Sequence, residues 1–249
     1  MTDRVVLITG AASGIGAATV RSLAAPGTSL MLTTRGNADG LAETARAAGD
    51  ADAVHTMTGD LSEPGFATAL VAATRDRFGR VDQIVSNAGK AQKSTFGALT
   101  REDITGAIAT NTLPFVDLVT AALPDLKASA WPRVVALSSF VTNDFGINGV
   151  IFPATSASKG AVEALARALA AQLAPDRIPV NCVAPGYTRK VGGHAALSQA
   201  AWDAAAEATP MGRIADPEDI AGAIAFMLSR EAAHVTGQIL RVDGGLSLL

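Results

Sequence analysis

The sequence contains very little cysteine and histidine. Among its 249 residues there is one cysteine, Cys182, and there are three scattered histidines, His55, His194 and His234. A single thiol cannot form an intramolecular disulfide, and it cannot supply the several thiolates of a Cys-rich metal site. We therefore expect neither a structural disulfide nor a metal centre.

The chain also lacks an excess of positive charge. Lys and Arg number 20 and Asp and Glu number 23, which gives a formal net charge of −3, and no run of basic residues occurs. Nucleic acids and anionic membranes attract basic patches, so the sequence predicts neither as a partner. The expected partners are small molecules and further copies of the same chain.

No long uninterrupted hydrophobic stretch is present. The apolar residues 161–174 are interrupted by Glu163, Arg167 and Gln172, well short of the roughly 20 apolar residues that a membrane helix needs. At the N-terminus a buried-strand pattern begins almost at once, which leaves no space for the regions of a secretory signal. These features predict a cytoplasmic protein.

What the sequence does contain is a regular alternation of short aliphatic runs with Ala- and Leu-rich helical segments. Runs that are apolar throughout are typical of parallel strands buried on both faces, and their alternation with helices predicts βαβ units. The chain is 49% hydrophobic and has no Pro/Gly/Ser-rich linker or internal repeat. We expect one α/β domain over residues 1–249, a Rossmann-like, doubly wound, mostly parallel sheet flanked by helices, with a substrate lid around 187–212. The seven runs that predict strands are 4–9, 29–34, 53–57, 83–86, 134–138, 179–183 and 238–242.

Two helices can be placed from local signals. Asp216 is an N-cap residue followed by a proline and two acids, which predicts a helix over 217–229. A second helix is expected to begin near Ser156, because apolar residues recur at helical spacing as far as Leu173. The alanines on its other face favour close packing against a partner subunit as well as the sheet, although high helix propensity alone also accounts for them.

A glycine-rich turn, residues 9–16, follows the first predicted strand and precedes a helical pattern. Glycine permits positive φ and lets the backbone approach a pyrophosphate, which the free amides at a helix start attract. Such a motif alone can be a simple tight turn, but its place after the first strand of a doubly wound sheet predicts dinucleotide binding. The candidate residues are Gly10, Ser13, Gly14, Ile15 and Gly16.

The order of these and later motifs resembles the short-chain dehydrogenase/reductase family, whose glycine motif is Thr-Gly, three residues, Gly, any residue, Gly. The resemblance covers essentially the whole chain and implies a homo-oligomer, a dimer or a tetramer. It also implies that Asp60 and Leu61 lie beside the adenine and that a fourth-strand motif lies under the cofactor. From the residues alone, two other interpretations are open. Asp60 is also a candidate helix cap, and Asn87-Ala88-Gly89, the fourth-strand motif, is also a candidate strand-ending turn. The further matching motifs are Asp60-Leu61, Asn87-Ala88-Gly89, Asn111, Ser138-Ser139, Lys159, Pro185-Gly186 and Val242-Asp243-Gly244-Gly245.

The end of the second predicted strand indicates which dinucleotide is used. An acid there would bind the ribose 2′-hydroxyl of NAD and repel a 2′-phosphate, but this strand ends in Thr34 and Arg35. An arginine can bind the phosphate through a planar, charge-assisted fork. We predict that NADPH is preferred over NADH, with Arg35 as the main determinant and Thr34 and Asn37 as helpers. The alternative is that Arg35 is an ordinary exposed charge, because Ser13 supplies no second basic residue in the glycine turn.

In the family, a serine polarises the substrate carbonyl and the tyrosine of a Tyr-x-x-x-Lys motif donates the proton. The lysine binds the nicotinamide ribose and lowers the tyrosine pKa, and an asparagine holds a water in the proton relay. The resemblance assigns these roles to Ser139, with Ser138 as an alternative, and to Lys159 and Asn111. The tyrosine position holds Thr155. An aliphatic hydroxyl ionises far less readily than a phenol with a pKa of about 10, so threonine can hydrogen-bond a carbonyl but is a poor proton donor.

The only tyrosine, Tyr187, follows Pro185-Gly186 after the sixth predicted strand. Ligands bind at the carboxyl ends of such strands, so Tyr187 is either a catalytic phenol, a pocket wall or a packing residue. In the same loop Thr188 is the candidate for contacts to the cofactor carboxamide. Apolar residues over 140–152, with Trp202 and Met211 in the lid, favour an apolar substrate or serve to anchor the lid. No charged group there identifies a carboxylate, phosphate or carrier-bound substrate.

Two functions follow. The first is an NADP(H)-dependent oxidoreductase acting on a ketone and secondary alcohol pair, with its activity weakened or altered by Thr155. The second is a non-redox or catalytically inactive cofactor-binding protein. Retention of Asn111, Ser139 and Lys159 favours the first, although Asn111 and Lys159 could be held for ribose binding alone.

Overall fold

One parallel sheet forms the centre of the molecule. The computed structural model describes residues 3–189 and 198–248. Within them the strand order is β3-β2-β1-β4-β5-β6-β7, and every neighbouring pair is parallel. All seven predicted strands are confirmed, with bounds within two residues of those expected. They are β1 (Arg4–Thr9), β2 (Thr28–Thr34), β3 (Val54–Thr58), β4 (Gln83–Ser86), β5 (Arg133–Leu137), β6 (Val180–Pro185) and β7 (Ile239–Val242).

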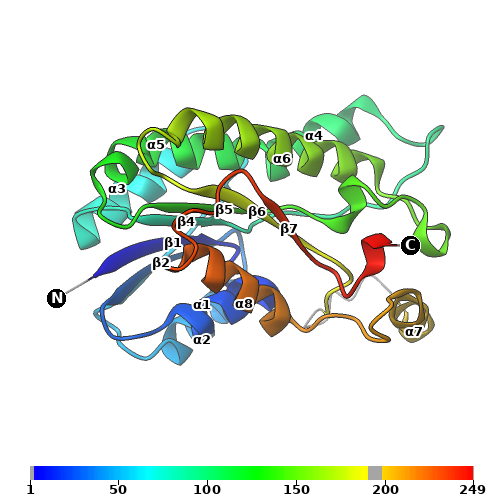
Figure 1. Ribbon diagram of the computed structural model, residues 1–249, viewed down its shortest axis with the longest axis horizontal. Helices are drawn as coiled ribbons and strands as arrows, with labels where there is room; N and C mark the ends of the chain where they lie inside the picture. Colours follow the sequence, from blue (N-terminus) through cyan, green and yellow to red (C-terminus); the bar gives the residue numbers. More distant parts are fainter. Residues whose placement is uncertain (1–2, 190–197, 249) are drawn as a thin grey trace.

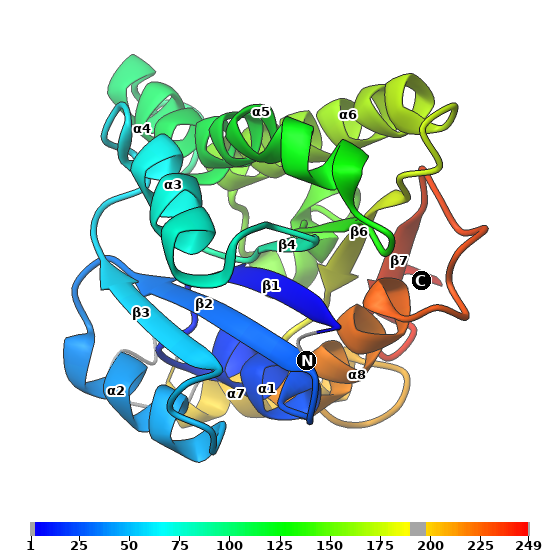
Figure 2. The ribbon, with the colours of Figure 1, turned by 90° about the vertical axis from the view of Figure 1, so that its left-hand side faces the viewer.

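Helices cover both faces of the sheet. Figures 1 and 2 show α3, α4, α5 and α6 on one side and α1, α2 and α8 on the other. Each side has its own cluster of buried apolar side chains, one around Leu118 of α5 and the other around Ile224 of α8. The predicted single-domain, doubly wound α/β fold is therefore confirmed. The helices are α1 (Gly14–Leu23), α2 (Ala38–Ala47), α3 (Phe66–Phe78), α4 (Arg101–Asn111), α5 (Leu113–Ala128), α6 (Pro153–Leu173), α7 (Gln199–Ala208) and α8 (Pro217–Leu228).

The helix predicted over 217–229 is confirmed as α8, whereas the predicted start of α6 differs from the observed one. Asp216 caps α8 as predicted and forms a capping box with Asp219. The helix α6 begins at Pro153, three residues before the expected start, because proline at the first helical position is preorganised for a helix. Strand β3 also differs from the expected buried pattern, since His55 and Thr56 are exposed at the edge of the sheet.

The run Arg101–Ala128, which contains α4 and α5, is long and apolar enough to cross a membrane by length and composition alone. Its residues Leu118, Ala122 and Leu126 are fully buried in the cluster between sheet and helices. The helix α5 packs on α3, and α4 packs on α6. Burial in the core therefore accounts for part of the apolar character of this run, since 39% of its apolar window is buried.

The order of the strands reverses between β1 and β4. From β1 the chain proceeds outward to β2 and β3, and it then returns to place β4 on the other side of β1. The connections that follow β1 and β4 at their carboxyl ends therefore diverge and leave a crevice, which is where open α/β sheets bind ligands.

Candidate active site

The glycine-rich turn packs too closely for side chains at two positions and is open at a third. A Cβ at Gly16 would lie 2.1 Å from the Gly10 carbonyl oxygen, and one at Gly10 would lie 2.8 Å from the Asn87 side-chain nitrogen. Gly14 has a φ of +52° and no heavy atom within 4 Å of its Cβ position. The turn is thus closely packed at Gly10 and Gly16 and open at Gly14, an arrangement that lets a ligand contact the backbone directly.

The start of α1 leaves its amide groups available. Its N-cap residue, Ser13, makes no side-chain capping bond, and the first turn contains no acid. Unsatisfied N–H groups and the helix dipole attract an anion. This helix start, beside the open face of Gly14, fits the pyrophosphate of a dinucleotide.

Asn87 ties β4 to the glycine turn. Its side-chain nitrogen donates to the carbonyl oxygens of Thr9 and Gly10 at 2.8 and 3.1 Å. The backbone N–H groups of Asn87 and Ala88 donate to the Thr9 hydroxyl at 3.0 and 2.9 Å. The fourth-strand motif therefore fixes the glycine turn beneath the proposed cofactor site.

Asp60 and Arg35 lie together beyond the end of β2. Asp60 accepts from the backbone N–H and hydroxyl of Ser62, and these bonds, with a smaller contribution from Arg35, lower the pKa of its carboxyl group. The alternative interpretation of Asp60 as a helix cap is wrong, because α3 begins at Phe66 with Gly65 as its N-cap, and Asp60 instead closes a local turn with Ser62. The Arg35 guanidinium lies 3.7 Å from Asp60 and its side chain is 68% exposed. Asn37 accepts from the Gly40 N–H and so caps α2.

A cavity of about 530 Å³ opens at the carboxyl ends of the strands. It brings together the expected catalytic side chains Ser139, Thr155 and Lys159, while Asn111 lies behind its wall. Ser13, Arg35, Asp60 and Leu61 are not part of the lining. Of the expected cofactor residues other than Lys159, the lining includes Ile15, Asn87, Gly89, Pro185, Gly186 and Thr188.

Thr155 and Asn111 both hold the loop that follows β4. Thr155 is buried in the first turn of α6, and its hydroxyl oxygen accepts from the Gln92 N–H at 3.0 Å. Asn111 accepts from the Lys90 N–H at 2.8 Å and donates to the Lys90 carbonyl and the Ser158 hydroxyl. The Asn111 amide thus positions the loop at Lys90 and ties it to α6. The Thr155 hydroxyl accepts the bond from the Gln92 N–H, and its own proton has no acceptor among the residues that the structure describes.

Lys159 lies one turn after Thr155 on α6 and is buried. Its ammonium group donates to the Leu137 carbonyl at 2.6 Å. Burial lowers the pKa of Lys159 to about 8. The nearby thiol of Cys182, in β6, is fully buried, and burial raises its pKa to about 12. Lys159 is therefore protonated at neutral pH but close to its titration point.

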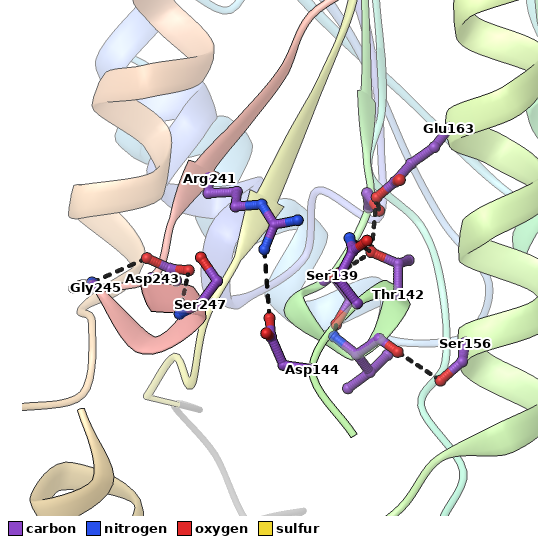
Figure 3. A network of polar contacts seen from close by, with 12 residues as sticks. Ser139, Thr142, Asp144, Ser156, Glu163, Arg241, Asp243, Gly245 and Ser247 are labelled. Carbon is purple, nitrogen blue, oxygen red and sulfur yellow. Dashed lines mark hydrogen bonds and ion pairs between the residues drawn. The ribbon is translucent and has the colours of Figure 1, made fainter. Parts of the chain in front are cut away.

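The two serines after β5 have different surroundings. The Ser138 hydroxyl donates to the carboxylate of Glu163, which also accepts from Thr142. Within residues 3–189 and 198–248 the Ser139 hydroxyl accepts a weak bond from the Val141 N–H at 3.4 Å and donates to no protein group. Figure 3 shows Glu163 reaching from α6 to this turn. The geometry favours Ser139 over Ser138 as a donor to a substrate.

Glu163 was not anticipated from the sequence. It is buried one helical turn after Lys159, and it anchors both sides of the Ser139 turn through Ser138 and Thr142. Ser156 adds a second attachment by donating to the Val141 carbonyl at 2.6 Å (Figure 3). The available signal was an acid on the apolar face of a predicted helix, which requires a polar partner when buried.

Tyr187 forms part of the cavity wall. Its ring packs against that of Phe140, with 4.7 Å between centroids. Burial raises the pKa of its phenol, which makes it a weaker acid than an ordinary tyrosine. These observations favour the pocket-wall interpretation over the catalytic one.

The loop after β6 is fixed by the C-terminal motif. A Cβ at Gly186 would lie 2.7 Å from the Asp243 Cα, so only glycine allows this approach. Asp243 accepts from the Gly245 and Ser247 N–H groups (Figure 3). Thr188 donates to the Gly186 carbonyl at 3.1 Å.

The expected apolar pocket is present in part. Val150 and Phe152 line the cavity, as does Trp202 of α7, whereas Phe145 is 67% exposed outside it. Met211 is also exposed. Residues 190–197 of the expected lid lie outside the described residues.

Two charged residues of the cavity were missed. Lys90 and Lys93 line it, although no charge in the stretches considered from the sequence indicated an anionic substrate. Lys90 follows Asn87-Ala88-Gly89 directly and Lys93 lies three residues further on, so two lysines within seven residues of the end of β4 were the signal available.

Comparison with known sequences gives the same assignment as the site geometry. The model of the family described as Enoyl-(Acyl carrier protein) reductase matches residues 10–247. The chain belongs to the short-chain dehydrogenase/reductase family of oxidoreductases.

Individual relatives cover almost the whole chain. The monensin polyketide synthase putative ketoacyl reductase of Streptomyces virginiae is 36% identical, over 98% of this chain and 97% of its own length. The cis-4-hydroxycyclohexanecarboxylate dehydrogenase of Sinomonas cyclohexanicum is 38% identical, over 98% and 96%. The crystal structure of gox2181 superposes with a TM-score of 0.91 at 26% identity and covers 100% of this chain and 97% of that chain.

Proposed function

We propose that this protein is an NADP(H)-dependent oxidoreductase that interconverts a ketone and a secondary alcohol, with a rate limited by Thr155. The observation that supports this proposal most strongly is the meeting of Ser139, Thr155 and Lys159 in one cavity, beside the residues that fit a dinucleotide. The Streptomyces relative is named as a putative ketoacyl reductase and the Sinomonas relative as a cis-4-hydroxycyclohexanecarboxylate dehydrogenase.

The side chains divide the chemistry between them. Bound NADPH supplies the hydride. Ser139 and Thr155 each have a hydroxyl proton with no acceptor among the described residues, so they orient and polarise the carbonyl oxygen. Lys159, whose pKa is near 8, is the strongest acid among the three and would supply the proton that the carbonyl oxygen gains. Asn111 and Glu163 position the loop and the turn that carry these groups.

The test is consumption of NADPH with a panel of ketones, followed by identification of the alcohol product. The oxidoreductase proposal predicts measurable but slow reduction. Tight NADPH binding without any consumption would instead support the non-redox alternative.

Replacing Arg35 by alanine is expected to raise the dissociation constant for NADPH about 10–100-fold and to leave that for NADH nearly unchanged. The reason is the loss of a charge-assisted bond to the 2′-phosphate, worth about 1.5–3 kcal/mol. Arg35 is 68% exposed and its one ion pair is long, so it can turn to the phosphate. Arg46→Ala, an exposed arginine of α2, is the matched control. Unchanged discrimination in Arg35→Ala would refute the assignment.

We also propose that the protein is a dimer or a tetramer. Leu113 and Val116 of α5 and Leu165 of α6 are exposed on the helical layer formed by α3 to α6. Burial of such side chains in a contact between copies is favourable. Light scattering of the purified protein gives its mass in solution, and a monomer at all concentrations would contradict this proposal.

A further inference from the structure

The cavity has a strongly unbalanced charge for a protein whose net charge is negative. Three lysines, Lys90, Lys93 and Lys159, line it, and no Asp or Glu is among its described lining residues. Neither Lys90 nor Lys93 forms an ion pair within residues 3–189 and 198–248. Lys159 is buried beside the reacting groups, which leaves two cationic side chains without a role in the chemistry described above.

Lys90 and Lys93 differ from Lys159 in depth. Both are exposed, whereas Thr155 and Lys159 are buried. The ammonium groups of the exposed pair therefore belong to the mouth of the cavity and the reacting groups to its floor. The walls between include the apolar side chains of Phe140, Val150, Phe152 and Trp202.

The loop that carries the two lysines is held at Lys90 and at Gln92. Asn111 binds the backbone N–H and carbonyl of Lys90. Thr155 accepts from the Gln92 N–H, and the Gln92 side chain donates to Asp103 at 2.7 Å. Fixed backbone at these points reduces the conformational freedom lost when the side chains engage a ligand.

We propose that the natural substrate is a ketone, or the matching alcohol, with an apolar frame and a carboxylate at the end remote from the carbonyl, and that Lys90 and Lys93 bind this carboxylate. The inference rests on the proposed function for the identity of the reacting group. Low-dielectric walls strengthen the attraction between a carboxylate and unpaired cations. The Sinomonas relative is named for cis-4-hydroxycyclohexanecarboxylate, a secondary alcohol with a carboxylate on the far side of an apolar ring, and this name agrees with the proposal.

The experiment compares two probes of nearly equal shape, 4-oxocyclohexanecarboxylate and its neutral carboxamide. Their dissociation constants are measured by calorimetry for the free protein and for its complex with NADP⁺, in which no reduction can occur. The carboxylate is expected to bind about tenfold more tightly, since each exposed charge pair contributes up to about 1 kcal/mol. High salt should reduce this preference.

Two variants make the test specific. The double variant Lys90→Gln with Lys93→Gln is expected to bind the two probes about equally, and it keeps the backbone bonds to Asn111. Lys127→Gln is the matched control, because Lys127 carries the same charge but pairs with Asp176 and does not line the cavity. It should leave the tenfold preference unchanged.

Equal affinity of the parent protein for the two probes overturns the proposal, as does failure to bind either probe or a preference that survives the double substitution. Failure of the proposed function is a separate outcome. If the carboxylate is preferred through Lys90 and Lys93 but no ketone is reduced with NADPH, the anion site stands and the redox assignment fails.

Discussion

Replacing Thr155 by tyrosine is expected to raise the rate of ketone reduction roughly 10²–10⁴-fold. This increase corresponds to an activation free energy that is lower by about 3–5 kcal/mol. Thr155 lines the cavity of about 530 Å³, so a tyrosine ring has space to enter it. The ammonium of Lys159, one helical turn away, would depress the pKa of the new phenol and make it an effective acid. NADPH oxidation with an activated ketone is the measurement.

Two controls separate acidity from packing. Thr155→Phe fills the same space without the hydroxyl and should give no increase. Both variants remove the acceptor of the Gln92 N–H, so the cost of that lost bond is common to them. If Thr155→Tyr binds NADPH normally but reduces ketones no faster than the parent, the explanation based on a missing acid is wrong, and a non-redox function is favoured.

Replacing Lys159 by methionine is expected to lower ketone reduction by the parent roughly 10²-fold and to remove most of the gain from Thr155→Tyr. Methionine retains much of the buried aliphatic volume but supplies no proton and no positive charge. It also leaves the Leu137 carbonyl without its donor, so thermal unfolding should be measured alongside activity.

The pH profile distinguishes an acid from a structural lysine. Burial lowers the pKa of Lys159 to about 8, so the ammonium form predominates below that pH and is lost above it. Reduction by the parent should therefore decline as pH rises through about 8, by about tenfold per unit for a single essential proton. The Lys159→Met variant should show no such decline. A parent profile that is flat between pH 7 and about 10 would contradict the role of Lys159 as the acid.

Much of the fold followed from the sequence because its signals are local. The aliphatic run of β1 is buried on both faces, as its composition predicts, and Asp216 starts α8 through a bond to its own first turn. Strand β3 and the start of α6 were less well predicted. Exposure of His55 depends on β3 being an edge strand, which is decided by the order of strands and not by the residues of β3 themselves.

Site residues could be predicted where one short sequence motif identifies them. They could not be predicted where their importance depends on contacts between segments far apart in the sequence. Gly16 lies in the glycine-rich turn, Asn87 ties the end of β4 to that turn, and Lys159 lines the cavity, while their cofactor roles remain predictions. Glu163 and Lys90 gained their significance only in three dimensions. The reason is that Glu163 contacts a turn 25 residues earlier in the chain, and Lys90 is held by an asparagine 21 residues later.

The burial of Cys182 has a consequence for oxidation. It is the only thiol in the chain, and its side chain is fully buried with a pKa of about 12. Oxidants and alkylating reagents react with thiolates that they can reach, so the folded protein offers them almost no reactive thiol. Cross-linking of two copies through a disulfide requires β6 to separate from the core first. The native protein should therefore keep its thiol reduced in an oxidising environment without a reductant, and modification of Cys182 should report that the sheet has opened.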